Sequence, residues 1–86
     1  MDKRLGFIGI IIEDRRHSAS KVNDILSNHA DIILSRTGLP FNEGHCCIIN
    51  IIVKCTTDEL GSLTGKLGKI NDISVKSSLS KKSIDN

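Results

Sequence analysis

Apolar residues in this chain alternate between the spacing of a strand and the spacing of a helix. Residues 5–14 hold an almost continuous run of isoleucine and phenylalanine bounded by charge, which predicts a strand buried on both faces. From Ser18 the apolar positions repeat at helical intervals as far as His29. This repeat predicts a helix with Ser18 or Ser20 as its N-cap.

The middle of the chain predicts two further strands joined by a turn. Residues 31–37 form a short apolar segment, and residues 38–44 contain two glycines, the single proline and an asparagine, which favour a turn. A returning strand over residues 45–55 has one wholly apolar face and one mixed face. Thr56 followed by Glu59 fits a capping box and predicts the start of a second helix.

A leucine stripe continues the second helix to the neighbourhood of Gly68, and residues 73–79 alternate as a last strand. Gly61 and Gly65 lie inside this helix. A glycine in a helix interior costs about 0.5–1 kcal/mol relative to alanine. Two of them therefore predict close approach of the helix backbone to the sheet or to another subunit.

This order of elements predicts an α+β fold, the ferredoxin-like βαββαβ plait, with a four-stranded antiparallel sheet and both helices on one face. One domain is expected over residues 1–79, followed by a polar tail over residues 80–86. The second face of the sheet stays bare, although two strands turn apolar side chains toward it. A homo-oligomer is expected to cover this face, with the interface residues Phe7, Ile11, Ile48, Asn50 and Ile52.

Composition excludes several classes of protein. The 86 residues include two phenylalanines and no tryptophan or tyrosine, so the chain lacks stacking platforms for single-stranded nucleic acid. The net charge of +2 comes from scattered lysines and arginines, and no nucleic-acid partner is expected. The longest apolar run is too short to span a membrane. Three cysteines in one strand fit a reducing compartment. We therefore expect a cytoplasmic protein without a membrane partner.

No arrangement of residues in the sequence indicates a reaction. The sequence shows neither a nucleophile with its base nor paired carboxylates in a pocket-like setting, so neither an enzyme nor a cofactor is expected. His45, Cys46 and Cys47 are ligand types for zinc, nickel or copper, and His45 and Cys47 would share one strand face. We favour core cysteines beside a loop histidine. A metal-binding sensor or carrier that uses these three residues is the alternative.

Two polar segments are candidates for binding a small effector. Arg15 and Arg16 lie beside the expected start of the first helix, whose free N–H groups and partial positive charge favour a carboxylate or a phosphate. The second segment joins an arginine to a turn that contains glycine and proline. The candidate ligand-binding residues are Asp14, Arg15, Arg16, Ser18, Arg36, Gly38 and Pro40.

Several short stretches together resemble one protein family. They are Ile11-Ile-Glu-Asp-Arg15, Arg36-x-Gly38-x-Pro40, Ile51-Ile-Val-Lys54, the run from Leu60 to Gly68, and Val75-Lys76. Over residues 5–79 the chain resembles the iron-only hydrogenase system regulators, and the run in the second helix is the most specific part.

This resemblance implies an ACT-like, ferredoxin-like fold that is related in shape to the ligand-sensing domain of the nickel-responsive repressor. It further implies a regulatory or sensory role in a hydrogenase system, assembly into dimers or tetramers, and no reaction. By analogy, ACT-like folds point to an amino acid as the effector. Hydrogenase-system proteins are further implied partners. The favoured interpretation is thus a non-enzymatic regulatory module.

Overall fold

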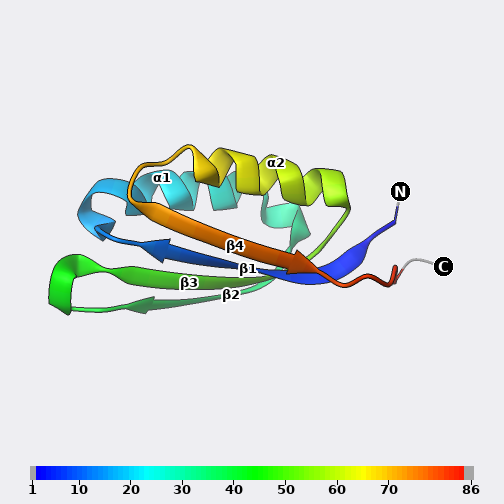
Figure 1. Ribbon diagram of the computed structural model, residues 1–86, viewed down its shortest axis with the longest axis horizontal. Helices are drawn as coiled ribbons and strands as arrows, with labels where there is room; N and C mark the ends of the chain where they lie inside the picture. Colours follow the sequence, from blue (N-terminus) through cyan, green and yellow to red (C-terminus); the bar gives the residue numbers. More distant parts are fainter. Residues whose placement is uncertain (1, 85–86) are drawn as a thin grey trace.

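The computed structural model describes residues 2–84, which form one antiparallel sheet with two helices on one face (Figure 1). The sheet has the strand order β2-β3-β1-β4. This arrangement confirms the predicted ferredoxin-like plait. In chain order the elements are β1 (Arg4–Ile12), α1 (Arg15–Asn28), the short 3₁₀ helix η1 (Ala30–Ile32), β2 (Ile33–Pro40), a second 3₁₀ helix η2 (Glu43–His45), β3 (Cys47–Cys55), α2 (Thr57–Gly68) and β4 (Ile73–Leu79).

Strand β1 lies in the middle of the sheet, between β3 and β4, and pairs antiparallel with both. Strands β2 and β4 form the two edges (Figure 1). The register places Ile10 opposite Ile49 on one side and opposite Val75 on the other. Residues that face each other across paired strands share one face of the sheet. Ile10 and Ile49 belong to the hydrophobic core and Val75 packs against it, so this shared face is the one that the helices cover.

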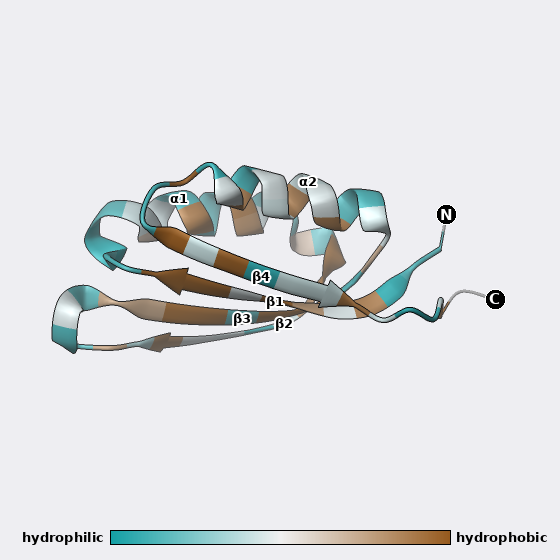
Figure 2. Cartoon of the chain, viewed as in Figure 1, coloured by the Kyte–Doolittle hydropathy of each residue, from teal (hydrophilic) through white to brown (hydrophobic). Residues whose placement is uncertain are grey.

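The hydrophobic core lies between the sheet and the two helices (Figure 2). Helix α1 contributes Val22 and Leu26 and helix α2 contributes Leu63 and Leu67, all of which are buried. These pairs stand four residues apart, so each helix buries one stripe. The sheet contributes the alternate residues of its two central strands, which are Ile8, Ile10, Ile12, Ile49, Ile51, Val53 and Cys55.

The start of α1 differs from the sequence prediction. Asp14 caps the helix, and its carboxylate accepts a hydrogen bond from the Arg16 N–H at 3.0 Å. Ser18 instead lies buried inside the helix, and its hydroxyl donates to the Asn71 carbonyl at 3.2 Å. The prediction of Ser18 or Ser20 as N-cap was wrong because the first turn of the helix is polar. The spacing of apolar residues, on which the prediction depended, does not detect a polar turn.

The start of α2 is as predicted. The Thr56 hydroxyl accepts a hydrogen bond from the Glu59 N–H at 3.1 Å, and the Glu59 carboxylate accepts one from the Thr56 N–H at 2.8 Å. Lys3 adds a salt bridge to the same carboxylate at 2.9 Å. The backbone bond from Thr56, followed by the bond from Lys3, lowers the pKa of Glu59 below its ordinary value of 4.5.

Strand β2 is longer than the sequence indicated. Gly38 and Pro40 pair with Ile49 and Cys47 inside the sheet, so the prediction of a turn from residue 38 onward was wrong. An edge strand tolerates proline because one row of its N–H groups has no partner to bond. The chain turns later, at Gly44, whose φ of 75° lies in the left-handed region that glycine adopts readily.

The predicted close approach of α2 to the sheet was wrong. Gly61 and Gly65 are exposed, and a Cβ atom added to either would meet no atom within 4 Å in the described chain. The predicted burial of the first strand on both faces was also wrong for the single chain, because Phe7 is 54% exposed on the face that no helix covers.

The described part of the polar tail is attached to the start of β1. The Arg4 guanidinium donates to the Lys81 carbonyl at 2.8 Å, and the Ile84 N–H donates to the Lys3 carbonyl at 2.9 Å. Residue 1 of the expected domain and residues 85–86 of the expected tail lie outside the described residues. No helix within residues 2–84 is long and apolar enough to cross a membrane.

Candidate functional site

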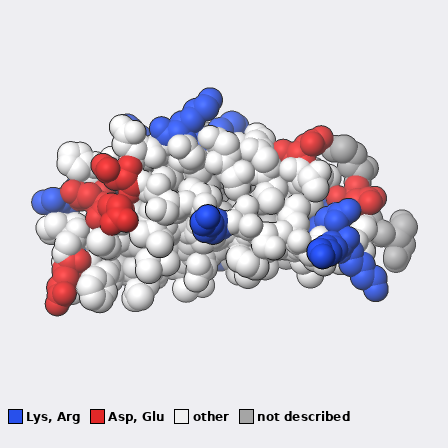
Figure 3. Space-filling view, in the orientation of Figure 1, with Lys and Arg blue, Asp and Glu red and all other residues white. Residues whose placement is uncertain are grey.

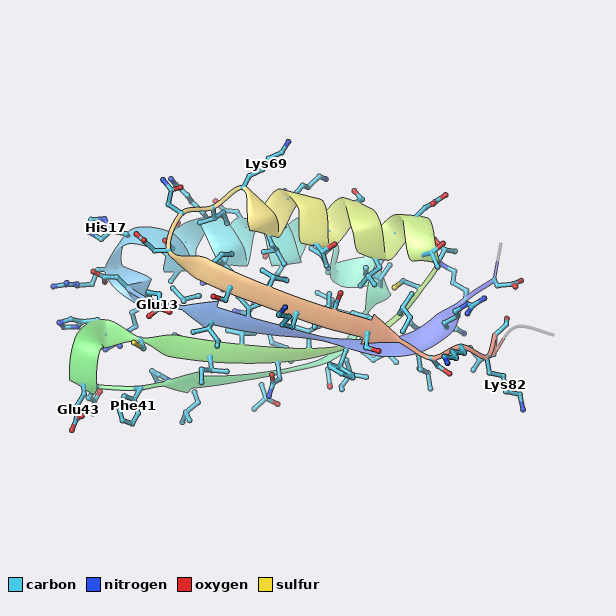
Figure 4. The ribbon with its side chains drawn as sticks, viewed as in Figure 1. Glu13, His17, Phe41, Glu43, Lys69 and Lys82 are labelled. Atoms are coloured by element: carbon cyan, nitrogen blue, oxygen red, sulfur yellow. The ribbon has the colours of Figure 1, made fainter. Side chains whose placement is uncertain are left out.

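The start of α1 and the connection between β2 and β3 lie together at one end of the molecule. Figure 4 shows Glu13 and His17 at this end, together with Phe41 and Glu43. The Arg15 guanidinium links the two segments, donating to the Phe41 carbonyl at 3.0 Å and to the Cys46 carbonyl at 3.2 Å. Arg15 therefore fastens α1 to the hairpin.

Arg16 and Asp14 form a bidentate pair at the same end. The guanidinium donates to Oδ1 at 3.0 Å and to Oδ2 at 2.9 Å. This side-chain bond lowers the pKa of Asp14 well below its ordinary value and raises that of Arg16. Because the Asp14 carboxylate also caps α1, it occupies part of the position that the sequence assigned to an external anion.

The predicted ligand-binding residues fall into two groups. Asp14, Arg15, Arg16 and Ser18 lie together at the start of α1. Arg36, Gly38 and Pro40 lie on β2, on the face that points toward the helices, because they pair with Ile51, Ile49 and Cys47. The Arg36 guanidinium reaches across to hydrogen bond with the Asn23 side chain of α1.

A polar cavity of about 230 Å³ lies beside Ser18, between α1 and the turn that precedes β4. Lys21 and Asp72 bring opposite charges to it, and neither forms an ion pair within residues 2–84. Sequence reasoning missed Asp72 because only the folded chain brings it beside α1. The signal that was available is the Asn-Asp pair before the last strand, a turn signature. The lining residues are His17, Ser18, Lys21, Ile70, Asn71 and Asp72.

A second cavity, of about 260 Å³, lies at the other end of α1, next to Arg36. It is lined by Leu26, Ser27, Ala30, Ile33 and Arg36. On the face drawn in Figure 3, lysines and arginines form separate groups, and acidic side chains gather at two places. This face carries no continuous basic surface of the kind that binds nucleic acid.

The open face is the sheet surface turned away from both helices, and it holds all the predicted interface residues. Phe7 pairs with Ile52 and Ile11 pairs with Ile48, which makes two apolar rows. Between them lies a row without large apolar side chains, in which Gly9 faces Asn50. The open face comprises Leu5, Phe7, Gly9, Ile11, Ser35, Thr37, Leu39, Ile48, Asn50, Ile52, Lys54, Ser74, Lys76 and Ser78.

His45, Cys46 and Cys47 do not lie together in one strand, contrary to the sequence prediction. His45 lies in η2 with a φ of 60°, and β3 begins only at Cys47, so the two do not share a strand face as predicted. Cys46 is half-buried, Cys47 packs against the core, and burial raises the pKa of Cys55. Within residues 2–84, no three His, Cys, Asp or Glu side chains lie close enough together to hold a metal ion.

Comparison with solved structures shows the same fold in an ACT domain and in a PII-like protein. The ACT domain of GTP pyrophosphokinase from Chlorobium tepidum is 22% identical over 88% of this chain and 99% of that domain, with a TM-score of 0.75. CPII, a nitrogen regulatory PII-like protein from Thiomonas intermedia K12 bound to ADP, AMP and bicarbonate, is 16% identical over 94% and 97% of the two chains, with a TM-score of 0.53. These matches confirm an ACT-like fold.

Sequence comparison identifies the family. No curated protein matches the chain. The uncharacterized protein TM1266 from Thermotoga maritima is 38% identical, with 93% of this chain and 100% of that chain aligned and a TM-score of 0.88. A family model described as "TM1266-like: Iron-only hydrogenase system regulator, putative" matches residues 4–77. The chain therefore belongs to the TM1266-like family of iron-only hydrogenase system regulators.

Proposed function

We propose that the chain is a non-enzymatic regulatory subunit of an iron-only hydrogenase system. It acts in the cytoplasm as a homo-oligomer and binds a small effector or a hydrogenase-system protein. Family membership supports the regulatory role. The observation that carries the assembly is the open face, where Phe7, Ile11, Ile48 and Ile52 are each more than two-fifths exposed on the two central strands.

Burial of the open face by a second copy would stabilise the assembly. Each Å² of apolar surface removed from water contributes about 25 cal/mol. Large apolar side chains exposed in two rows on one face of a small protein mark a candidate interaction site. The core of a domain this small is thin, and association is a common way to stabilise it.

Light scattering of the unmodified protein at micromolar concentration tests the assembly. We expect an oligomer that Ile52→Lys dissociates, because the new charge would be buried between two sheets. Ser62→Lys is the matched control, since it adds the same charge on the exposed side of α2. A monomeric unmodified protein would refute the assembly.

The effector that we propose is an amino acid or a small anion bound at the N-terminal end of α1, in the cavity beside Ser18. A zwitterion suits this cavity because Lys21 can pair with a carboxylate and Asp72 with an ammonium group. Arg16 extends the same region but is paired with Asp14. Arg36, Gly38 and Pro40 provide a second, separate candidate position on β2.

Thermal-shift measurements with a panel of amino acids and inorganic phosphate test the effector. We expect stabilisation by one of them that is lost in Lys21→Ala and in Asp72→Asn. Asparagine tolerates the left-handed backbone of residue 72, whose φ is 63°, so the second variant keeps the turn. Lys69→Ala is the control for loss of an exposed lysine. A ligand response that survives both variants but disappears in Arg36→Ala would move the site to β2.

A further inference from the structure

Two glycines of β1 stand in different environments. A Cβ atom on Gly6 would lie 2.4 Å from the Ser78 carbonyl oxygen and 2.5 Å from a Leu79 methyl group, so the chain itself requires glycine there. A Cβ atom on Gly9 would lie 3.6 Å from the Asn50 side-chain oxygen and 3.9 Å from the Lys76 carbonyl oxygen. Both of these are ordinary van der Waals distances, so the chain has room for a side chain at position 9.

Glycine at position 9 nevertheless weakens the central strand. Glycine in a strand interior costs about 0.5–1 kcal/mol relative to alanine and offers no side chain to pack. Because the described chain leaves room for a Cβ atom at Gly9, packing within the single chain does not account for this glycine. A glycine inside a strand often marks a bulge, a tight bend or close approach of a ligand or another backbone, and the pairing of β1 with β3 and β4 shows no bulge at Gly9.

A hollow of about 220 Å³ lies beside Gly9 in the open face. Ile11 and Ile48 form an apolar wall of this hollow, and Asn50 and Lys76 bring polar groups to it. Its full lining is Gly9, Ile10, Ile11, Ile48, Asn50, Ser74 and Lys76. Phe7 is not part of that lining, although it lies two residues away on the same strand and face and is 54% exposed.

We propose that Phe7 of one copy inserts into the Gly9 hollow of a second copy, and that the second copy does the same in return. This inference rests on the proposed homo-oligomer and specifies which residues of the two copies face each other. A two-fold axis that lies between the two sheets, crosses β1 at right angles and passes over Ile8 exchanges positions 7 and 9. Such an interface is isologous, so each copy supplies one ring and one hollow.

The same symmetry gives compatible neighbours in the flanking rows. It sets Leu5 of one copy over Ile11 of the other, which buries apolar surface on both sides. Lys54, which pairs with Leu5, falls over the other copy's Ile48. Lys76, which pairs with Gly9, falls over the other copy's Ser78. Neither lysine therefore meets its own counterpart, and like charges do not oppose each other.

The size of the open face favours a second copy as its occupant. Four strands spaced about 4.8 Å apart, with about eight residues rising about 3.4 Å each, cover roughly 500 Å² in projection. Side-chain relief makes the accessible area larger than this projection. A standard protein interface uses about 800 Å² per partner, so the whole open face, paired with itself, approaches that size.

Photo-crosslinking maps the register directly. Phe7 is replaced by p-benzoylphenylalanine, and ¹⁴N-labelled chains are mixed with ¹⁵N-labelled chains to mark intermolecular products. We expect intermolecular crosslinks to Gly9, Ile11, Asn50 or Lys76 of the other copy. Intermolecular crosslinks that instead map to Ile52 and its neighbours would overturn this register while leaving the oligomer intact.

Gly9→Val separates folding from association. Valine suits a central strand, so we expect thermal stability of the dissociated chain to be retained or raised. Because the hollow is then filled, we expect the dissociation constant of the oligomer to rise by at least about tenfold. The fold is checked by circular dichroism at a concentration at which the chain is monomeric.

Gly9→Ala and Gly6→Ala serve as controls. Gly9→Ala fills less of the hollow and should weaken association less than Gly9→Val, whereas Gly6→Ala should destabilise the fold itself. Unchanged association of Gly9→Val would overturn the inference but not the oligomer. A monomeric unmodified protein would overturn both, so the two failures are distinguishable.

Discussion

The Arg15 guanidinium donates a hydrogen bond to the Cys46 carbonyl at 3.2 Å and so joins the first turn of α1 to the residue before β3. The Phe41 N–H donates to the same carbonyl at 2.9 Å. One oxygen thus receives both the bond that closes the β2–β3 hairpin and the bond that fixes the helix to it. Arg15 holds this end of the molecule together.

Arg15→Ala should loosen the hairpin end. We expect a loss of about 1–2 kcal/mol in the free energy of unfolding, since a charged donor leaves two carbonyls. The Phe41 amide should exchange faster with deuterium in a native-state NMR measurement, because its acceptor is no longer held. Arg16→Ala is the control, since within residues 2–84 the Arg16 guanidinium pairs only with Asp14. Equal exchange of the Phe41 amide in both variants would contradict this structural role.

Stability should fall with acid below about pH 5. The folded pKa values of Glu59 and Asp14 lie below their ordinary values of 4.5 and 3.8. The unfolded chain therefore binds more protons in this window, and the free energy of unfolding rises with pH there and is fully present above it. Urea titrations at fixed protein concentration measure this dependence. In Glu59→Gln we expect the free energy of unfolding to fall less steeply with decreasing pH. An unchanged slope would count against the contribution of Glu59.

Gly61→Ala and Gly65→Ala should each stabilise the protein. Both sites are exposed and have room for a Cβ atom. Alanine is favoured over glycine in a helix by about 0.5–1 kcal/mol, and about 1 kcal/mol raises the melting temperature of a domain this small by roughly 4–8 °C. Calorimetry measures the shift. Weaker association in either variant would show instead that this face of α2 meets another subunit.

Cys47 at the start of β3 and Cys46 just before it are predicted to be structural. Cys47→Ser should lower stability by about 1–3 kcal/mol, because Cys47 packs against the core and serine would place a hydroxyl there. Cys46→Ser should change it little, since Cys46 is only half-buried. Elemental analysis of protein purified without a histidine tag provides the second readout. Stoichiometric zinc or nickel in the unmodified protein that is lost when Cys46→Ser and Cys47→Ser are combined would favour the metal sensor.

Local signals in the sequence were sufficient to predict the fold. The alternation in residues 45–55 follows directly from a sheet with one covered face, and Thr56 with Glu59 forms its capping box from neighbouring residues. The start of α1 was missed for the opposite reason. Asp14 caps a first turn made of charged residues, and hydrophobic spacing carries no information there.

Non-local contacts account for what could not be predicted about the site. Ser18 was selected as part of an anion site, but its hydroxyl is bonded to Asn71, more than fifty residues away. Arg15 is likewise bonded to carbonyls of a distant hairpin. Strand β2 continues through Pro40 because β3 lies beside it, which residue preferences alone do not reveal. The open face was predictable, since strand periodicity alone assigns Phe7 and Ile52 to one side.

The strand order has a consequence for synthesis of the chain. Strand β1 is made first, yet its two neighbours are residues 47–55 and residues 73–79. Until both of these segments have left the ribosome, β1 carries free backbone N–H and C=O groups beside a row of isoleucines. An uncovered edge of this kind pairs readily with other chains. Release of β4 from the ribosome exit tunnel is therefore the step that protects a nascent chain from aggregation.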